Sequence, residues 1–271
     1  MKYYLYNSKA NNGIKPVVAE GIELIDAVGL DYKQYFADLK PEDEVVLLGG
    51  DGTLNYFVNA MRGAEISNNV YLLGSGTGND FFNDIEKKAG DEVLVNKYLE
   101  NLPIVRVNGL EKLFLNNMGF GIDGYCCEVA DQIKEKEPNK EINYAGIAIK
   151  GMLFHFKPCH ATVTVDGEVH EFDNVWIAPT MKGRFYGGGM DMAPAQDRFS
   201  GKLSVVIYRS KSVIKALAAF PSIFKGEHVK NTDMVTIIEG KKIKVQFSRP
   251  CAAQIDGETV LNVSEYEVEQ N

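Results

Sequence analysis

The chain has 271 residues, of which 45% are hydrophobic and 24% charged, and its formal net charge at pH 7 is −8. These fractions are typical of a globular protein and exclude an intrinsically disordered chain. The negative charge argues against sequence-independent binding to nucleic acid, so we expect no nucleic-acid partner. No uncharged apolar run approaches the roughly 18 residues of a membrane span, and the N-terminal apolar stretch is too short for a signal peptide. We therefore expect a soluble, cytoplasmic protein.

The cysteines and histidines form none of the common metal or redox motifs. The four cysteines make no C-x-x-C pair, and the four histidines show no H-E-x-x-H spacing. These absences argue against a zinc ribbon, a thioredoxin-like redox motif and the commonest zinc-hydrolase signature.

The first hundred residues alternate short apolar runs with helical patterns. We predict strands at Tyr3–Tyr6, Val45–Leu48 and Tyr71–Leu73. Helices are predicted at Leu54–Arg62, where apolar residues recur at helical spacing, and at Asp91–Glu100. Strands that alternate with helices indicate βαβ units and a parallel sheet, so the N-terminal part is predicted to be an α/β domain.

After Pro103 the pattern changes to many short strands. The predicted strands are Ile104–Val107, Leu113–Asn116, Ala161–Val165, Val169–Ile177, Leu203–Tyr208, Met234–Ile238 and Ile243–Phe247. Helical patterns interrupt them at Tyr125–Lys134, Tyr144–Phe156 and Val213–Phe224. Tight hairpin turns at Asp166-Gly167 and Glu239-Gly240 indicate an antiparallel sandwich or barrel. We therefore predict two domains, residues 1–103 and a β-rich domain at 104–271.

A first glycine-rich loop, Gly49-Gly50-Asp51-Gly52-Thr53, follows the Val45–Leu48 strand and opens a helix. Glycines there let the backbone approach a phosphate, and a helix N-terminus offers unpaired N–H groups. An acid inside such a loop repels a phosphate, unless it binds Mg²⁺ or takes a proton from an attacking hydroxyl. An ordinary strand-to-helix turn with Asp51 as N-cap is the structural alternative.

A second loop, Gly74–Asp80, follows the next predicted strand and contains three glycines, two hydroxyls, an amide and a carboxylate. A right-handed crossover keeps the two strands parallel, so both loops open onto one edge of the sheet. Ligands bind at that edge in open α/β folds. We therefore expect Asp51 and Asp80 to converge on one metal–phosphate site.

Three further segments carry glycines and acids in unusual density. Gly119–Gly124 matches G-x-G-x-x-G, which alone indicates a dinucleotide site, but it lies where the chain has turned antiparallel. Gly187–Pro194 is too rich in glycine for a strand interior, and Asp197 follows it. Gln254–Glu258 places two acids across a tight turn.

Taken in this order, the motifs resemble those of the diacylglycerol kinase catalytic family, in particular its soluble bacterial lipid kinases related to sphingosine kinases. They are GGDGTLN (Gly49–Asn55), GTGNDF (Gly76–Phe81), GFGIDG (Gly119–Gly124), GGGMDMAP (Gly187–Pro194), KGEH (Lys225–His228) and QIDGE (Gln254–Glu258). The resemblance implies an NAD-kinase-like α/β domain and a C-terminal β-rich sandwich domain, with the active site in the cleft between them. It also implies transfer of the γ-phosphoryl group of ATP to a lipid hydroxyl, with Mg²⁺.

The resemblance assigns roles to individual residues. It makes Asp51 and Glu258 catalytic and implies that they also hold the catalytic Mg²⁺. Asp80 and Asp123 are implied on the substrate side. The implied nucleotide-binding residues are Asn7, Gly49, Gly50, Gly52, Thr53, Gly76, Thr77, Gly78 and Asn79.

The chain also departs from the family pattern. Only Asn7 matches the opening N-P-x-S-G motif, and Tyr56 stands where the first loop is commonly followed by Glu. Ser200-Gly201 stands where many members have Asp-Gly in a structural metal loop, which leaves Asp197 as the nearby candidate ligand. We therefore expect this structural ion to be weak or absent.

Two other functions stay open at this point. The GGDGT motif is shared with NAD kinases, and the departures at Tyr56 and Ser200 suit a non-catalytic nucleotide- or lipid-binding protein. The leading hypothesis is a lipid kinase with ATP and a membrane lipid as partners. Such a protein would visit the inner face of the membrane transiently, and a homodimer is compatible with the sequence.

Overall fold

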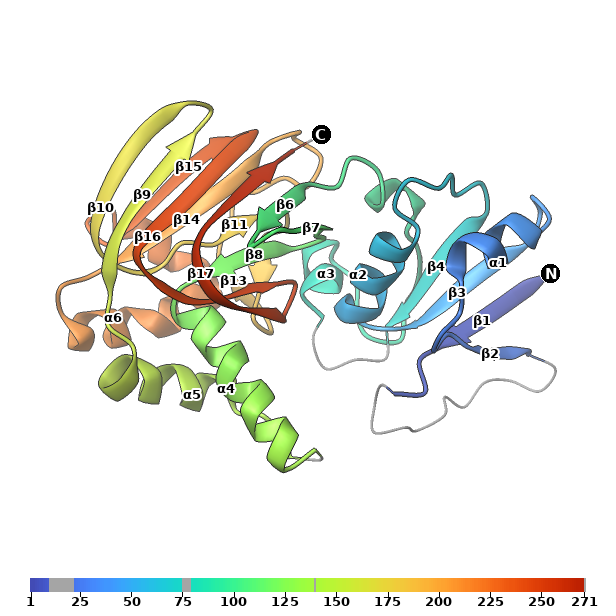
Figure 1. The fold of residues 1–271 in the computed structure, drawn as a ribbon, viewed down its shortest axis with the longest axis horizontal. Helices are drawn as coiled ribbons and strands as arrows, with labels where there is room; N and C mark the ends of the chain where they lie inside the picture. The colour runs from blue at the N-terminus through green and yellow to red at the C-terminus, as the bar shows by residue number, and fades with distance from the viewer. Residues whose placement is uncertain (10–21, 75–78, 139, 271) are drawn as a thin grey trace. The chain divides into compact units, whose positions relative to one another are not determined.

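The computed structural model describes residues 1–9, 22–74, 79–138 and 140–270. The chain forms two compact units, Met1–Leu102 and Pro103–Asn271 (Figure 1). Among the described residues, no helix is both long enough and apolar enough to cross a membrane.

The first unit is built on a five-stranded sheet in the order β2-β1-β3-β4-β5. Its strands are β1 (Lys2–Tyr6), β2 (Leu24–Asp26), β3 (Glu44–Gly49), β4 (Asn69–Gly74) and β5 (Glu92–Leu94). The first four strands in this order run parallel, and β5 pairs antiparallel with β4. The helical segments are α1 (Tyr32–Asp38), α2 (Asp51–Ala60), α3 (Asp80–Asp84) and the 3₁₀ helix η2 (Asn96–Tyr98). The predicted parallel α/β sheet is confirmed.

The core of this unit lies around the central strand β3. Val45, Val46 and Leu47 are completely buried, as strands are when both faces of a parallel sheet are covered. Leu54 and Phe57 are buried on α2, on the side of the helix that its apolar spacing predicts.

The helix predicted at Asp91–Glu100 is wrong for its first half, and only the 3₁₀ helix η2 within it is helical. The first half instead forms β5, and the backbone N–H of Val95 extends the ladder to the carbonyl of Val70 (2.8 Å). The side chain of Asn96 then bridges to the same strand, accepting from the N–H of Val70 and donating to the carbonyl of Asn68, both at 2.8 Å. Pairing with the edge of β4 outweighs the weak helical pattern of these residues.

The second unit is β-rich, and its strands are β6 (Ile104–Val107), β7 (Leu110–Leu113), β8 (Asn117–Phe120), β9 (Cys159–Val165), β10 (Glu168–Ile177), β11 (Thr180–Met181), β14 (Leu203–Arg209), β15 (Val235–Gly240), β16 (Lys242–Ile255) and β17 (Glu258–Glu269). A small separate hairpin is formed by β12 (Phe185–Tyr186) and β13 (Met190–Asp191). The large sheet has the order β7-β6-β17-β16-β8-β11-β14-β10-β9, with β15 paired to β14. It closes on itself because β16 pairs with β9 along its first half and with β8 near its end.

Helical segments cover part of this sheet. They are α4 (Ile122–Lys136), α5 (Tyr144–Lys150), the π-helix η3 (Gly151–His155), α6 (Val213–Ala219) and the 3₁₀ helices η4 (Phe220–Lys225) and η5 (Glu227–Lys230). The predicted antiparallel β-rich domain and its helical interruptions are therefore confirmed.

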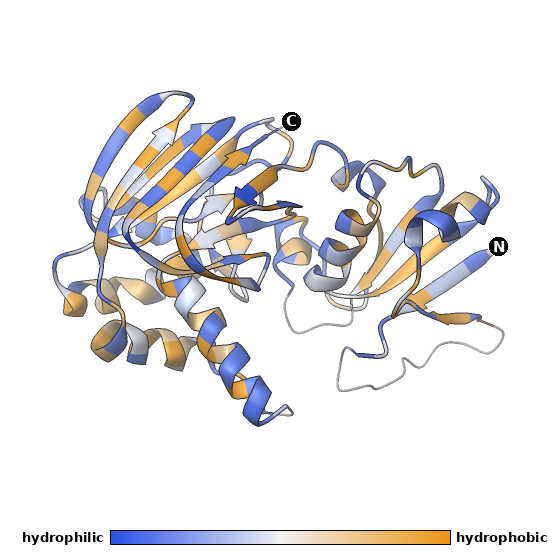
Figure 2. Ribbon diagram, in the orientation of Figure 1, coloured by the Kyte–Doolittle hydropathy of each residue, from blue (hydrophilic) through white to orange (hydrophobic). Residues whose placement is uncertain are grey.

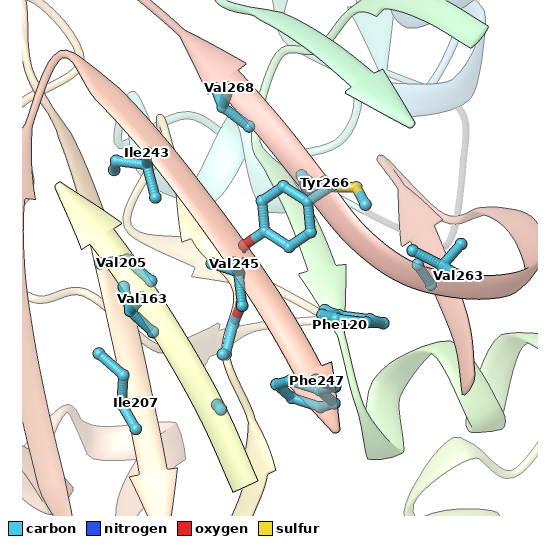
Figure 3. Close-up of a cluster of buried hydrophobic side chains, with 14 of the residues drawn as sticks. Phe120, Val163, Val205, Ile207, Ile243, Val245, Phe247, Val263, Tyr266 and Val268 are labelled. Carbon is cyan, nitrogen blue, oxygen red and sulfur yellow. Dashed lines mark hydrogen bonds between the residues drawn. The ribbon is translucent and has the colours of Figure 1, made fainter. Parts of the chain in front are cut away.

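The interior of the second unit is a dense apolar cluster contributed by many strands (Figure 3). The rings of Phe120 on β8 and Phe247 on β16 stack with centroids 4.1 Å apart. The buried hydroxyl of Tyr266 donates to the carbonyl of Ala178 and shares a second hydrogen bond with Thr180, both at 2.8 Å. Satisfying this hydroxyl lets a large aromatic ring lie in the core without an unpaired polar atom.

The strand predicted at Leu113–Asn116 is also wrong beyond its first residue, since Leu113 ends β7 and residues 114–116 connect β7 to β8. Phe114 and Leu115 are buried, which explains their strand-like pattern. The backbone N–H groups of Leu115 and Asn116 do not join a ladder and instead donate to the carboxylate of Asp256, at 2.6 and 2.9 Å. The carboxylate of Asp256, which lies in a distant turn, thus accepts the hydrogen bonds that a neighbouring strand would otherwise accept.

Candidate functional site

The two glycine-rich loops of the first unit start side by side. Gly49 and Gly74 are register partners at the carboxyl ends of β3 and β4. Asp51 is the first residue of α2, and its carboxylate accepts the backbone N–H of Asp80 (2.9 Å) and of Phe81 (3.3 Å) at the start of α3. The acid of the first loop therefore fixes the helix that follows the second loop.

The glycines of the first loop serve different purposes. A Cβ atom at Gly49 would lie 1.9 Å from Oγ1 of Thr53, so only glycine allows the helix to start so close to the strand. A Cβ at Gly52 would meet no atom of the described residues within 4 Å. Gly50 is the N-cap residue and provides no side chain to cap α2. The start of this helix thus has the open approach and the positive dipole end that suit a phosphate.

The strand order marks where a ligand is expected in this sheet. The chain moves from β1 outward to β2 and then returns past β1 to β3, so the topological switch point lies between β1 and β3. Ligands of open α/β sheets bind outside the carboxyl ends of the strands at such a point. Asn7 follows β1, and its side-chain oxygen accepts the backbone N–H of Lys9 (2.8 Å). The topology thus brings Asn7 and the Asp51 loop to the same edge.

Part of the second loop lies outside the described residues, namely the predicted nucleotide-binding positions Gly76, Thr77 and Gly78. Asn79, the next residue, is the N-cap of α3, and its buried side-chain oxygen has no hydrogen-bond partner within the described ranges. Asp80 is buried as the first residue of α3. Buried polar atoms usually have a hydrogen-bond partner, so an amide oxygen that has none among the described residues, beside a helix start, is a position that a bound ligand would satisfy.

In the second unit, Asp123 occupies the second position of α4 and is buried. Neither carboxyl oxygen makes a well-formed hydrogen bond to any described residue. Burial raises the pKa of Asp123 to about 6, against the opposing effect of the nearby backbone and the Gln254 amide. A Cβ at Gly119 would lie 1.7 Å from the carboxylate, so this glycine makes room for Asp123. An isolated buried carboxylate with a shifted pKa is a typical functional-site candidate.

The two acids of the QIDGE motif have different environments. Glu258 is exposed at the start of β17 and forms an ion pair with Lys112 of β7. Asp256 lies in the preceding turn with a positive φ of 45°, and besides Leu115 and Asn116 its carboxylate binds the backbone N–H of Asn117 (2.9 Å). Asp256 is therefore a structural anchor, whereas Glu258 is accessible to a ligand.

Two buried cations of the second unit were not predicted from the sequence. Arg198 donates to the carbonyl of Leu115 (2.7 Å) and to the side chain of Asn116 (3.0 Å). Lys182 donates to the side chain of Gln270 (2.8 Å), and burial lowers the pKa of Lys182 to about 8. Their partners lie far away in the sequence, so no local pattern could have revealed them.

The metal-ligand predictions rest on the chemistry of the donors. Asp197 accepts the backbone N–H of Phe199 at 2.8 Å, and its role as a structural metal ligand stays a prediction. Among the described residues no group of three or more His, Cys, Asp or Glu side chains could hold a metal ion. Mg²⁺ is commonly held by only one or two carboxylates together with water and substrate phosphates. The assignment of Asp51 and Glu258 as ligands of a catalytic Mg²⁺ stays a prediction.

Comparison with known proteins identifies the family. The diacylglycerol kinase catalytic domain model matches residues 22–103, and the model of the YegS C-terminal NAD kinase beta sandwich-like domain matches residues 116–267. The chain belongs to the diacylglycerol kinase family. A diacylglycerol kinase of Mycobacterium tuberculosis is 27% identical over 250 residues, which cover 88% of this chain and 79% of the relative.

The solved structures agree on the fold of this family. A crystal structure of a diacylglycerol kinase from Bacillus anthracis str. Sterne matches with a TM-score of 0.65 and 18% identity, covering 99% of this chain and 94% of the other. The resemblance inferred from the motifs is thereby confirmed, and the chain is a kinase of the lipid kinase class. Membership of a kinase family implies ATP as the phosphoryl donor.

Proposed function

We propose that this diacylglycerol kinase family member transfers the γ-phosphoryl group of ATP to the hydroxyl of diacylglycerol or a similar lipid, with Mg²⁺. The observation that carries the proposal is the position of Asp51. Its carboxylate lies at the uncapped start of α2 and binds the N–H groups that begin α3. A negative charge at the start of a phosphate loop opposes anion binding unless it serves a metal ion or a proton transfer.

In this proposal the loop backbone binds the phosphates and the acids handle the metal and the proton. The N–H groups at the start of α2 orient the polyphosphate, since phosphoryl transfer depends mainly on positioning and charge neutralisation. Mg²⁺, held by Asp51 and Glu258 with the phosphates, would neutralise the developing charge. Asp51 or Glu258 accepts the proton of the lipid hydroxyl. Asp80 and Asp123 bind the polar head of the acceptor.

The experiment that tests this function is a direct phosphorylation assay. The purified chain is incubated with radiolabelled ATP and Mg²⁺, with diacylglycerol and other lipids in mixed micelles and with NAD in a parallel reaction. We expect a labelled lipid, identified by mass spectrometry, and no labelled NADP. Labelled NADP without labelled lipid would favour the NAD-kinase alternative. ATP or lipid binding without any transfer would favour the non-catalytic alternative.

The role of Glu258 has a matched control in its own ion-pair partner. Glu258→Gln removes the carboxylate, whereas Lys112→Gln breaks the same ion pair and leaves the carboxylate in place. Because the pair is exposed, neither change should cost more than about 1 kcal/mol of stability. We expect only Glu258→Gln to abolish turnover, and to combine non-additively with Asp51→Asn. Equal activity of the two single variants would remove Glu258 from the mechanism.

A further inference from the structure

The helical face of the second unit carries an unusual amount of exposed apolar surface. We call this face the helical patch, defined as residues 144–157 and 211–225, which contain α5, η3, α6 and η4. Its inner side is part of the protein core, because Ala148, Met152, Phe156, Ala216 and Ile223 are buried in one cluster. The two halves of the patch therefore pack on the same core and turn their other sides away from it.

The outer side of the helical patch presents large apolar side chains to solvent. Phe154 is 74% exposed and Ile214 is 79% exposed, and Ile149, Leu153 and Phe224 are each more than 40% exposed. Ile149 and Leu153 are four residues apart and share one helix face. Figure 2 shows hydrophobic residues along α5 and α6. Single exposed apolar residues are ordinary, but a group on adjoining helices marks an interaction surface.

The charge of the helical patch is opposite to that of the protein. The whole chain carries −8, yet these two segments contain no Asp or Glu. They contain five lysines, namely Lys150, Lys157, Lys211, Lys215 and Lys225. All five residues are exposed. A second copy of the chain would bring two such basic surfaces against each other and would be repelled.

We propose that the helical patch docks the protein on an anionic lipid bilayer. Apolar side chains enter the boundary between headgroups and acyl chains, while lysines on the same segments contact the anionic headgroups. The inference rests on the proposed function, because a kinase that acts on a membrane lipid must reach its acceptor at the bilayer surface. It adds the surface that makes the contact and the charge of the lipid that it selects.

Vesicle co-sedimentation of the full chain tests this inference without nucleotide. We expect binding to vesicles of equal parts phosphatidylglycerol and phosphatidylcholine, weak binding to phosphatidylcholine alone, and loss of binding at high salt. The double variant Phe154→Ser/Ile214→Ser should bind at least tenfold more weakly. Lys215→Gln should weaken binding roughly fivefold at low salt, the usual contribution of one lysine near an anionic surface. Val169→Ser, at an apolar residue on β10 that is 59% exposed, is the control and should bind like the natural chain.

The outcomes separate this inference from the proposed function. Failure of the natural chain to bind anionic vesicles, or equal binding by the double variant, would overturn the docking surface even if micellar lipid is phosphorylated. Vesicle binding that follows the expected pattern would support the surface even if no lipid is phosphorylated, in which case only the kinase proposal falls. A dimer in light scattering that Phe154→Ser/Ile214→Ser dissociates would assign the patch to a second copy and overturn the membrane role.

Discussion

Replacing the buried carboxylate of Asp123 by an amide should stabilise the protein and impair its activity. In the native structure this carboxylate has no well-formed hydrogen bond among the described residues. Burial raises the pKa of Asp123 from 3.8 to about 6, so the fold disfavours the charged form. Asp123→Asn keeps the shape of the side chain and removes the charge that the fold tolerates poorly.

The size of the expected stability change follows from the pKa values of Asp123 in the folded and the unfolded chain. Above pH 6, Asp123 is ionised in both the folded and the unfolded chain, and the difference between about 6 and 3.8 corresponds to about 3 kcal/mol of lost stability. Below pH 3.8, Asp123 is protonated in both states and costs nothing. The stability of the natural protein therefore falls, relative to the variant, as the pH rises from 4 to 6. A buried amide also needs partners, so we expect a net gain of roughly 1–3 kcal/mol at pH 8.

The assay is urea unfolding of both proteins at several pH values between 4 and 8. The pKa of the buried His228 is lowered by desolvation, but His228 titrates in both proteins and cancels in the comparison. Glu135→Gln, on the exposed side of the same helix, serves as the control and should leave stability within about 0.5 kcal/mol. A gain for Asp123→Asn at pH 8 that vanishes near pH 4 would match the reasoning.

Two results would refute the idea that the charge of Asp123 destabilises the folded protein. An equal change in stability at pH 4 and pH 8 would mean that the charge of Asp123 is not the cause. A loss of stability at pH 8 would mean that the carboxylate makes favourable interactions in the folded protein. If the variant is more stable and also less active, Asp123 is a residue that the protein keeps for function at the expense of stability.

Three further outcomes are expected. Asp51→Asn should lower phosphoryl transfer by about 10²–10⁴-fold with the fold retained by circular dichroism, and a loss below about fivefold would exclude it as a catalytic group. Gly52→Ala should weaken ATP binding in calorimetry without lowering Tm, whereas Gly49→Ala should lower Tm because its Cβ overlaps the following helix. Unchanged ATP affinity in Gly52→Ala would contradict the proposed phosphate-binding loop. Asp256→Ala removes an acceptor of three backbone N–H groups and should cost roughly 2–4 kcal/mol in urea unfolding, and a cost under 1 kcal/mol would show that the anchor is dispensable.

The sequence predicts the fold where short segments determine their own structure. The continuous apolar run at β3 and the glycines after it are local signals, so the strand, the loop and α2 could all be located from the sequence. β17 gave no such signal, because Val263, Tyr266 and Val268 alone among its residues are buried. Its long pairing with β16 comes from tertiary context, which single-sequence reasoning does not see.

The candidate site likewise contains residues that local sequence indicates and residues that only the folded structure indicates. The Asp51 loop could be proposed as a phosphate-binding loop from the sequence, because such loops have a glycine pattern of their own. The anchoring role of Asp256 could not, because its partners are backbone groups of a segment that lies far earlier in the chain. Asp123 was suggested only by resemblance, and its burial and shifted pKa are properties of the folded unit.

The pairing of strands distant in sequence sets the order in which the protein can be completed during its synthesis. Residues 1–102 form a compact unit of their own, so we expect this unit to fold while the rest of the chain is still being made. In the second unit, β6 is one of the first strands to be synthesised, but it pairs with the last residues of β17. In the same way, the ring of Phe120 stacks on that of Phe247, which is synthesised much later. Until β16 and β17 leave the ribosome, the apolar cluster around Phe120 lacks the side chains that these two strands contribute. Chaperone dependence and aggregation during expression should therefore concentrate in the second unit.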